Sequence, residues 1–493
     1  MGQEVKISAK DKAITGLNPY IWLFSSDESW FVLDLHTNKL FALRPREAEV
    51  IKRWFAGEGL TDLAKEYPSE TTELERLRNE GLFGCQPPEG LSFGAEWDEI
   101  KKMILNKRSR TVIELTQKCN LRCKYCTFSG GFKDHRTHSS KTMSKEVLES
   151  AINSAFKHGE EVEEINIGFY GGEPLLAFHL LKWAVYFART KSAQKKVTFS
   201  ITTNATLVDE KKARFLKDND FNILVSIDGP EYMHNRYRVY PNGCGSYMAT
   251  AEGLKLLIDT YPLEMHNHIG LNMVIPSIDW FKHLQELWNN ETWLPKSIRA
   301  QAVVMDPPDG LLLPQPTDGV RFEDIKAGWL EKTKMGKEAE TKLLSDMFDK
   351  AFAEIHQRLI YQGRRNSFFP NGCCIPGVRK IYVTVEGNYQ ICERVHGCPD
   401  IGNVESGVDI NKIKTIVDDY IKNSFEDCKD CFALPNCQIC FANAYESNEY
   451  SRKRKREACE FMRESIAQNF ADYVLLCRKY PHKMDAWDKV LIS

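Results

Sequence analysis

The chain has 493 residues, which at roughly 150 residues per domain suggests about three domains. Apolar residues make up 42% and charged residues 27%, a balance that excludes a disordered or fibrous protein. The 66 basic and 68 acidic residues leave a formal charge of -2, so no overall charge favours binding to nucleic acid or to an anionic membrane.

The sequence predicts neither a membrane-spanning segment nor an export signal. No apolar run reaches the roughly 18 residues that a membrane-spanning helix needs. The N-terminal segment MGQEVKISAKDKAITG has no apolar stretch of the kind found in secretory signals. We therefore expect a cytoplasmic protein with no membrane partner.

Residues 1–95 form the first predicted unit. Apolar stretches predict three short strands, at Tyr20–Phe24, Trp30–Leu35 and Lys39–Leu43. Helical spacing predicts three short helices after them, at Arg46–Phe55, Leu60–Tyr67 and Thr72–Leu82. This order indicates a winged-helix-like α+β domain, which could instead serve as a stabilising appendage or a dimerisation arm.

Residues 105–330 alternate short apolar runs with helical segments. The runs predict six strands, at Thr111–Leu115, Ile165–Phe169, Val197–Thr202, Asn222–Ile227, Ile269–Ile275 and Ile298–Val304. Helical segments between them include Lys145–Lys157, Leu176–Ala188 and Lys211–Asp218. Such alternation is typical of a parallel sheet with right-handed crossovers. The fold class is therefore α/β, and six units fit a partial (βα)6 barrel.

The remaining chain divides into a bridging helical segment, residues 331–365, and a cysteine-rich C-terminal domain, residues 366–493. Ten of the 15 cysteines lie in that domain. A reducing cytoplasm disfavours disulfides, and clustered thiols in such a compartment more often bind metal. A secreted, disulfide-bonded tail is the alternative.

Three closely spaced cysteines, Cys119, Cys123 and Cys126, follow the first strand of the predicted barrel. A loop at the C-terminal end of a barrel strand is where such folds place their chemistry. Three thiolates can hold three irons of a four-iron cubane and leave the fourth iron without a protein ligand. A structural zinc site usually has four protein ligands, and His135 or His138 could supply the fourth.

This segment resembles the signature of the radical S-adenosylmethionine (radical SAM) enzymes. The resemblance implies a [4Fe-4S] cluster whose open iron is chelated by S-adenosyl-L-methionine. An electron, from a donor such as flavodoxin or ferredoxin, would then cleave the sulfonium and release a 5'-deoxyadenosyl radical that abstracts hydrogen from a substrate. We therefore expect a radical SAM oxidoreductase, in which the cofactor performs the difficult step and the protein positions it.

Residues after the later strands match other elements of that family. The implied cofactor-binding residues are Gly171, Gly172, Glu173, Asn204, Ser226 and Arg238. The resemblance assigns the GGEP segment to the methionine ammonium and the asparagine to a ribose contact. It assigns the serine and the arginine to the ligand carboxylate, a charge-assisted role that suits arginine.

The cysteine-rich domain resembles the SPASM extension of radical SAM enzymes, which holds two auxiliary [4Fe-4S] clusters. The resemblance assigns the distal cluster to Cys428, Cys431, Cys437 and Cys459. It assigns the cluster nearer the barrel to Cys392, Cys440 and one or both of Cys373 and Cys374, with Cys398 as a spare candidate. The spacing before the last cysteine of the run is one residue shorter than is common in the family. If only three cysteines bind the nearer cluster, its open iron could take a substrate thiolate. Zinc ribbons, and clusters that only support the fold or carry electrons, are alternatives.

The cysteine-rich domain also contains two charged features that could have a function. Glu393 follows Cys392 directly, where some peptide-modifying relatives carry an acidic residue near the reaction centre. It is the candidate catalytic proton acceptor, with an exposed carboxylate as the alternative. The basic run Arg452–Arg456 is either a docking patch or a solvated helix face.

The first unit resembles the PqqD-like domain found fused to peptide-maturing radical SAM enzymes. There, a leader peptide adds a strand to the edge of the sheet. Together, these resemblances predict a maturase of a ribosomally synthesised precursor peptide, which binds the leader and forms Cys thioether crosslinks. The alternatives are another crosslink, epimerisation, or formylglycine formation as in sulfatase maturases, and, from another class, a non-catalytic iron-sulfur carrier.

Overall fold

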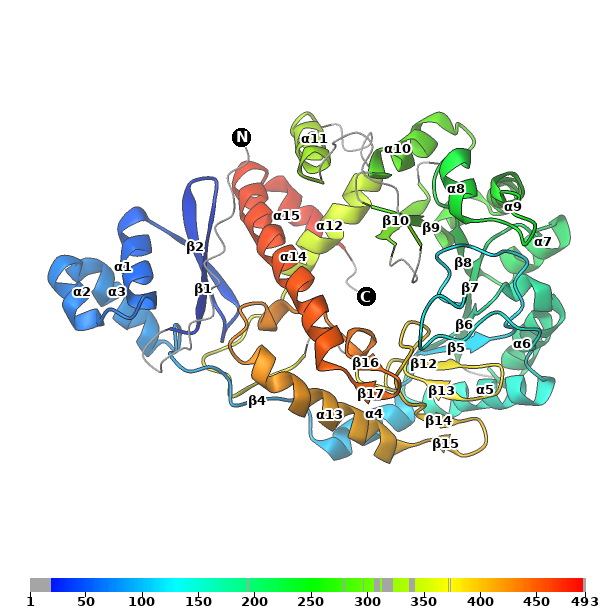
Figure 1. The fold of residues 1–493 in the computed structure, drawn as a ribbon, viewed down its shortest axis with the longest axis horizontal. Coiled ribbons are helices and arrows are strands. Elements are labelled where there is room, and N and C mark those ends of the chain that lie inside the picture. Colours follow the sequence, from blue (N-terminus) through cyan, green and yellow to red (C-terminus); the bar gives the residue numbers. More distant parts are fainter. Residues whose placement is uncertain are drawn as a thin grey trace.

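The computed structural model describes residues 19–490 apart from 193–194, 278–279, 296, 306–310, 313–321, 337–341, 371 and 373. Figure 1 shows the N-terminal elements at one side, the central sheet and its helices at the other, and long C-terminal helices between them. None of the described helices is both long enough and apolar enough to cross a membrane.

The N-terminal unit has the predicted order of strands and helices. Its antiparallel sheet contains β1 (Ile21–Ser26), β2 (Ser29–Asp34) and β3 (Lys39–Leu43), in the order β1-β2-β3. The helices are α1 (Pro45–Phe55), α2 (Leu60–Glu66) and α3 (Pro68–Asn79). One face of the sheet packs against these helices, through buried side chains that include Ile21 and Val32. The comparison with a winged helix stays a prediction.

The other face of this small sheet packs against the C-terminal part of the chain. Trp22 stacks on Phe432 with ring centroids 4.5 Å apart and meets Phe470 edge-on at 5.5 Å. The Ser26 hydroxyl donates a hydrogen bond to the carbonyl of Ala471 at 2.6 Å. Both faces of the sheet are therefore covered, and the unit is not structurally independent of the rest of the protein.

The substitution Trp22→Ala tests this contact. Trp22 is buried, and removing a buried tryptophan side chain costs about 3–5 kcal/mol in the free energy of unfolding. We expect one cooperative unfolding transition, shifted to lower denaturant concentration. The control Phe461→Ala removes an aromatic ring that is 72% exposed and should change the midpoint little. A separate, early transition of the N-terminal unit in the wild type would contradict the shared core.

The central sheet contains six consecutive parallel strands, as the sequence predicted. They are β5 (Arg110–Glu114), β6 (Glu164–Tyr170), β7 (Lys196–Thr203), β8 (Phe221–Ser226), β9 (Ile269–Ile275) and β10 (Arg299–Val304). Two strands that the sequence did not predict complete an eight-stranded sheet. β12 (Lys380–Val383) pairs parallel to β5, and β13 (Tyr389–Gln390) pairs antiparallel to β12. The cysteine-rich domain thus continues the sheet beside the strand that precedes the first cysteine motif.

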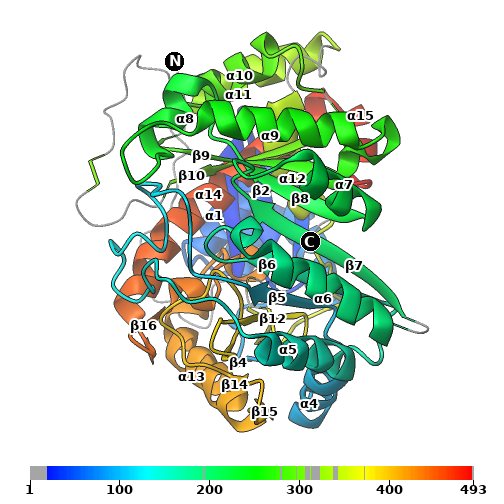
Figure 2. The same cartoon turned by 90° about the vertical axis from the view of Figure 1, so that its right-hand side faces the viewer.

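Helices cover one face of this sheet. Figure 2 shows in a row α5 (Lys145–His158), α6 (Phe178–Lys191), α7 (Glu210–Asp218) and α9 (Tyr247–Thr260). Along β9, Leu271 and Met273 are buried, whereas Asn272 between them is half-buried. Successive side chains of a strand point to opposite faces, so the apolar set packs under the helices.

The opposite face of the sheet is polar. Arg110 donates a hydrogen bond to Ser200 at 3.5 Å, and Ser200 donates to Asn166 at 3.0 Å, so polar groups of three strands meet there. Parallel sheets are usually apolar on both faces because both are covered. A polar, half-buried face is what a fold needs if a substrate is to enter beside the strands.

The other described elements connect these layers. The helices are α4 (Trp97–Asn106), α8 (Glu231–Tyr237), α10 (Phe281–Asn290), α11 (Phe322–Lys334), α12 (Lys342–His356), α13 (Ile410–Cys428), α14 (Arg452–Lys479) and α15 (His482–Trp487). Short strand pairs are β4 (Gly90–Leu91) with β11 (Ser367–Phe368), β14 (Gly402–Asn403) with β15 (Gly407–Val408), and β16 (Tyr445–Glu446) with β17 (Glu449–Tyr450). The helix predicted in the bridging segment corresponds to α12.

Candidate functional site

The three cysteines of the first motif lie in the loop directly after β5, at the C-terminal edge of the sheet. The backbone N–H of Leu121 points at the sulfur of Cys119, and that of Phe128 at the sulfur of Cys126, each at 3.4 Å. Hydrogen bonds of this kind favour a charged sulfur. The loop backbone thus already supplies donors that would stabilise thiolates.

Burial opposes ionisation of these thiols. It raises the pKa of Cys119 to about 12 and that of Cys123 to about 11, and it also raises the pKa of Cys126. A bound metal centre reverses this preference, because a coordinating thiol loses its proton. The three side chains therefore fit the role of ligands to a positively charged iron site better than that of free nucleophiles.

The GGEP segment after β6 is hydrogen-bonded to the backbone of the cysteine loop. The N–H of Gly172 donates to the carbonyl of Thr116 at 2.9 Å, and the N–H of Glu173 donates to that of Lys118 at 2.8 Å. A Cβ atom on Gly172 would lie 1.9 Å from the Lys118 carbonyl oxygen. Gly171 has a φ of 127°, a conformation that favours glycine. The glycines therefore allow two backbone segments to touch, in addition to any contact with a ligand.

The carboxylate of Glu173 joins the ends of two strands. One oxygen accepts hydrogen bonds from the Thr203 hydroxyl at 2.8 Å and the Leu175 N–H at 3.1 Å, and the other accepts from the Asn204 N–H at 2.8 Å. Burial raises the pKa of Glu173 even though these bonds favour the charged form. The side chain is a structural link and also a buried carboxylate close to the cysteine loop.

Asn204 continues this connection into the loop itself. Its side-chain amide donates to Asn120 at 3.0 Å, and Asn120 donates to the Thr206 hydroxyl at 2.7 Å. Asn120 follows Cys119 directly. The end of β7 therefore fixes the loop at its first cysteine.

The segment after β8 supplies a buried charged group next to the loop, because Arg238 directly follows α8. The Arg238 guanidinium donates to the Tyr125 hydroxyl at 2.7 Å, and that hydroxyl donates to the Asp228 carboxylate at 2.5 Å. Burial alone would lower the pKa of Arg238, but its interactions with Cys123, Tyr125 and Asp228 raise it well above its usual value. A permanent cation therefore lies next to the cysteine loop.

One donor of this cation is still available. The Nε atom of Arg238 is buried and makes no hydrogen bond within the described residues. Buried donors are normally satisfied, so a free one at this place suits the carboxylate of a ligand. Ser226, at the end of β8, is also buried. Sequence analysis identified Arg238 and Ser226 but not Tyr125 or Asp228.

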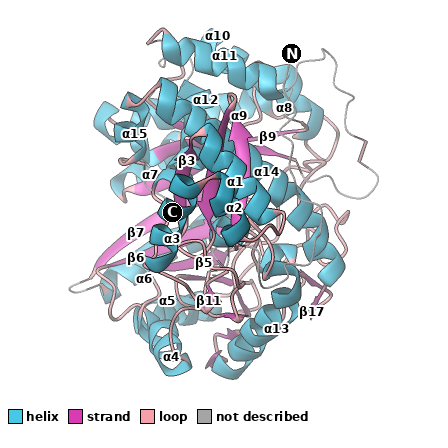
Figure 3. Cartoon of the chain, turned by 90° about the vertical axis from the view of Figure 1, so that its left-hand side faces the viewer, coloured by secondary structure: helices cyan, strands magenta, loops and turns pink. Residues whose placement is uncertain are grey.

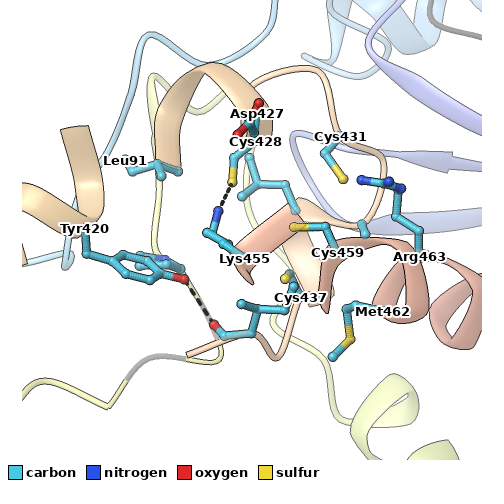
Figure 4. A pocket seen from close by; sticks show the side chains of 14 residues that line it. Leu91, Tyr420, Asp427, Cys428, Cys431, Cys437, Lys455, Cys459, Met462 and Arg463 are labelled. Atoms are coloured by element: carbon cyan, nitrogen blue, oxygen red, sulfur yellow. Dashed lines mark hydrogen bonds between the residues drawn. The ribbon is translucent and has the colours of Figure 1, made fainter. Parts of the chain in front are cut away.

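The structure brings the four cysteines assigned to the distal cluster around one cavity. Figure 4 shows Cys428, Cys431, Cys437 and Cys459, which line a cavity of about 30 Å³. They come from the end of α13, the following loop and α14. Segments that are separate in sequence therefore meet at these thiols.

The cysteines assigned to the nearer cluster form a second group. Burial raises the pKa of Cys440, and the neighbouring Cys374 adds to the effect. Burial likewise raises the pKa of Cys392 to about 11 and that of Cys398 to about 12, with smaller contributions from Cys440 and Cys392 respectively. The cysteines of this group are therefore close enough for one thiol to affect the pKa of another. The remaining candidate, Cys373, lies outside the described residues.

The described donors do not converge on a single point. Within the part of the chain that the structure describes, no three His, Cys, Asp or Glu side chains are placed to hold one metal ion. A zinc site needs four donors on one ion, whereas each thiolate of a [4Fe-4S] cluster binds a different iron.

Glu393 lies in an ion pair. Its carboxylate is 2.9 Å from the Lys380 ammonium, and its side chain is 16% exposed, so the exposed carboxylate considered from sequence is not what the structure has. Burial raises the pKa of Glu393, but the charge of Lys380 outweighs this effect and the pKa is lowered. A lowered pKa weakens a base, so the proton-acceptor role stays a prediction.

A larger cavity, of about 700 Å³, lies between the cysteine loop and the cysteine-rich domain. Its lining includes Phe128 and Arg136 from the first, and Tyr382, His396 and Cys398 from the second. The Arg136 guanidinium lies 3.5 Å from the Phe128 ring centroid. This cavity could not be predicted from the sequence, because its two walls come from segments far apart in the chain.

Comparison with known proteins agrees with this arrangement. Residues 113–274 match the family described as the radical SAM superfamily. The cysteine-type anaerobic sulfatase-maturating enzyme of Clostridium novyi is 31% identical over 141 residues, which are 28% of this chain and 37% of that enzyme. The radical SAM cyclopropyl synthase TigE of Paramaledivibacter caminithermalis is 27% identical over 179 residues, 34% of this chain and 36% of that protein.

These alignments span less than half the length of either relative. The solved structure of native anSMEcpe with bound AdoMet covers 77% of this chain and all of that chain, with a TM-score of 0.56 and 21% identity. At this identity the likeness supports a shared fold alone. The family match begins in β5, before the cysteine loop, and ends in β9, so the part of the chain that matches the radical SAM superfamily includes the three cysteines and the segments after β6, β7 and β8.

Proposed function

We propose that this protein is a radical SAM maturase that modifies a ribosomally synthesised precursor peptide, forming Cys thioether crosslinks. The observation that carries the proposal is the convergence of polar groups from the segments after three successive strands on the loop of Cys119, Cys123 and Cys126. Glu173 follows β6, Asn204 follows β7, and Arg238 lies beyond β8.

Different residues of this site would bind the two cofactors. The three cysteines hold a [4Fe-4S] cluster, and the free Nε donor of Arg238 receives the carboxylate of S-adenosyl-L-methionine. When bound, these groups supply a radical that abstracts hydrogen from the substrate. Gly171 and Gly172 keep the cysteine loop close to the sheet, and the Asp228–Tyr125 pair holds the arginine in place.

A large cavity and the known relatives both support a peptide as the substrate. The cavity of about 700 Å³ has polar and charged walls and lies between the cysteine loop and Cys398, one of the thiols of the nearer group. The relatives include sulfatase-maturating enzymes, and anSMEcpe has been solved with AdoMet and the Cp18Cys peptide. We assign two auxiliary [4Fe-4S] clusters to the cysteine-rich domain, with flavodoxin or ferredoxin as the electron donor.

The edge strand β3 is the proposed leader-binding site. Within the described residues no strand pairs with its outer edge, while the opposite edge strand, β1, packs on α14. An unpaired edge accepts an added strand through backbone hydrogen bonds. Figure 3 looks onto this unit, with β3 beside α1.

Hydrogen exchange tests the leader site. A precursor peptide with its leader should slow amide exchange at residues 39–43, because an added strand would take up the outward N–H groups. The same peptide without its leader should leave exchange at these residues unchanged. Protection confined to the 700 Å³ cavity with both peptides would contradict the assignment of β3.

Anaerobic turnover tests the proposed function as a whole. Reconstituted protein with reductant and S-adenosylmethionine should release 5'-deoxyadenosine, and a co-expressed precursor peptide should lose two hydrogens for each crosslink formed. Formylglycine in the product would favour the sulfatase-maturase alternative, which the Clostridium novyi relative supports. An epimerised product would keep the mass of the peptide. With all clusters present, failure to form 5'-deoxyadenosine would leave only an iron-sulfur carrier.

A further inference from the structure

The basic run Arg452–Arg456 at the start of α14 has two different sides. Arg452 and Arg456 both pair with Asp427 at the surface, at 2.8 Å and 2.6 Å. Lys455, between them, is turned inward and is only 3% exposed. The run is therefore not a uniform solvated face, because one of its cations is buried.

The buried cation faces the cavity that the distal cysteines line. The Lys455 ammonium lies 3.2 Å from the sulfur of Cys428 and 5.6 Å from the centre of the Tyr420 ring. Figure 4 shows the side chain extending into the space between these residues. Within the described part of the chain, no carboxylate forms an ion pair with Lys455. Its closest polar partner is thus a thiol.

Helix α14 places two further functional side chains at the same cavity. Lys455, Cys459 and Arg463 are spaced four residues apart, which places them on one face of α14, and all three line the cavity. Burial raises the pKa of Cys431, and the charge of Arg463 opposes that effect. Two cations and a cysteine from a single helix therefore face the thiols of α13 and its loop.

A buried ammonium is unfavourable unless a negative group accompanies it. A neutral thiol supplies little of that charge, whereas a metal–thiolate group supplies it fully. The position of Lys455 is therefore explained if the four cysteines bind an anionic cluster. This step rests on the assignment of the distal [4Fe-4S] cluster in the proposed function.

We propose that Lys455 is a fixed countercharge for the distal cluster and raises its reduction potential. Reduction adds one electron to a group that is already anionic. A cation in contact with a ligand sulfur stabilises the reduced form more than the oxidised form. Lys455 is thus a positioning residue that keeps the distal cluster reducible, and Arg463 acts in the same direction.

A redox titration of the full-length, reconstituted protein tests the proposal. The signal of the distal cluster is the one that disappears in the variant Cys428→Ala. Lys455→Met should lower its midpoint potential by at least about 59 mV, equivalent to a tenfold smaller equilibrium constant for one-electron reduction. Lys455→Arg keeps the charge and should stay close to the wild type. The control Lys453→Met removes an exposed cation of the same helix and should also leave the potential unchanged.

The alternative outcomes are distinct. An unchanged potential in Lys455→Met, with full iron content, would overturn the countercharge. If Lys455→Met and Lys455→Gln both lose the distal cluster while Lys455→Arg retains it, the charge is needed for assembly, which supports the proposal. Loss in Lys455→Arg as well would assign the residue to packing and overturn it.

The proposed function is tested separately. If Cys428→Ala removes no signal, the distal cluster and the role of Lys455 both fall. Formation of 5'-deoxyadenosine by the same sample still reports on the radical SAM site, because that site uses the cysteines after β5.

Discussion

Replacing Cys123 with Ala is expected to abolish formation of 5'-deoxyadenosine. With only Cys119 and Cys126 left, two thiolates would have to hold a cluster that uses three. The substitution also removes one of the groups that raise the pKa of Arg238, the residue that binds the ligand in the proposed site. Anaerobic assay of the reconstituted variant with reductant should give product at the level of protein without iron.

The matched control is Cys244→Ala. This cysteine is exposed and lies in a turn beyond α8, so its loss should change neither iron content nor product formation. The auxiliary sites should keep their iron in Cys123→Ala, since their cysteines come from a different part of the chain. Wild-type product formation by Cys123→Ala would remove the basis of the radical SAM assignment of function.

The six parallel strands could be predicted because each carries a short apolar run between polar helical segments. Each predicted start lies within one residue of the observed start. Parallel strands connected by helices depend mainly on local pattern and on crossover handedness, and both can be inferred from sequence. The strand ends, and with them the positions of the site residues, followed from the same pattern.

The contacts between distant segments could not be predicted in this way. β12 has only four residues, and its pairing with β5 joins segments about 270 positions apart. Trp22 lies in the first predicted strand of the N-terminal unit, but its ring stacks on Phe432 and meets Phe470, both far along the chain. Local periodicity shows that a side chain is buried, not which segment buries it.

The candidate site shows the same division. Cysteine spacing identified the thiols, and the assignment of those in the C-terminal domain to two clusters stays a prediction. Tyr125 and Asp228 were missed because single polar residues have no characteristic spacing, although Tyr125 lies between two of the cysteines. Lys455 lies in a basic run, and most residues of such a run are expected to be exposed. Only its position four residues before Cys459, on the same face of the helix, could have indicated that its side chain points inward.

The substitution Gly172→Ala should disrupt the site without removing any functional group. The added Cβ would lie 1.9 Å from the carbonyl oxygen of Lys118, and the atoms it meets are backbone atoms that cannot rotate away. The backbone hydrogen bonds of the GGEP segment to Thr116 and Lys118 would have to lengthen. If the cysteine loop is displaced by about 1 Å, the rate of the reaction can fall on the order of 100-fold. Overpacking costs about 1–3 kcal/mol of stability.

Measurement of 5'-deoxyadenosine formation, iron content and the unfolding midpoint separates these effects. We expect a large fall in rate with a smaller fall in stability. The control Gly328→Ala adds a methyl group in α11, where no atom lies within 4 Å of the new Cβ. It should stabilise that helix slightly, by about 0.5–1 kcal/mol, and leave the rate unchanged. An active Gly172→Ala variant with normal iron content would show that the loop can move away from the sheet, and that the close backbone contact is not what positions the cysteines.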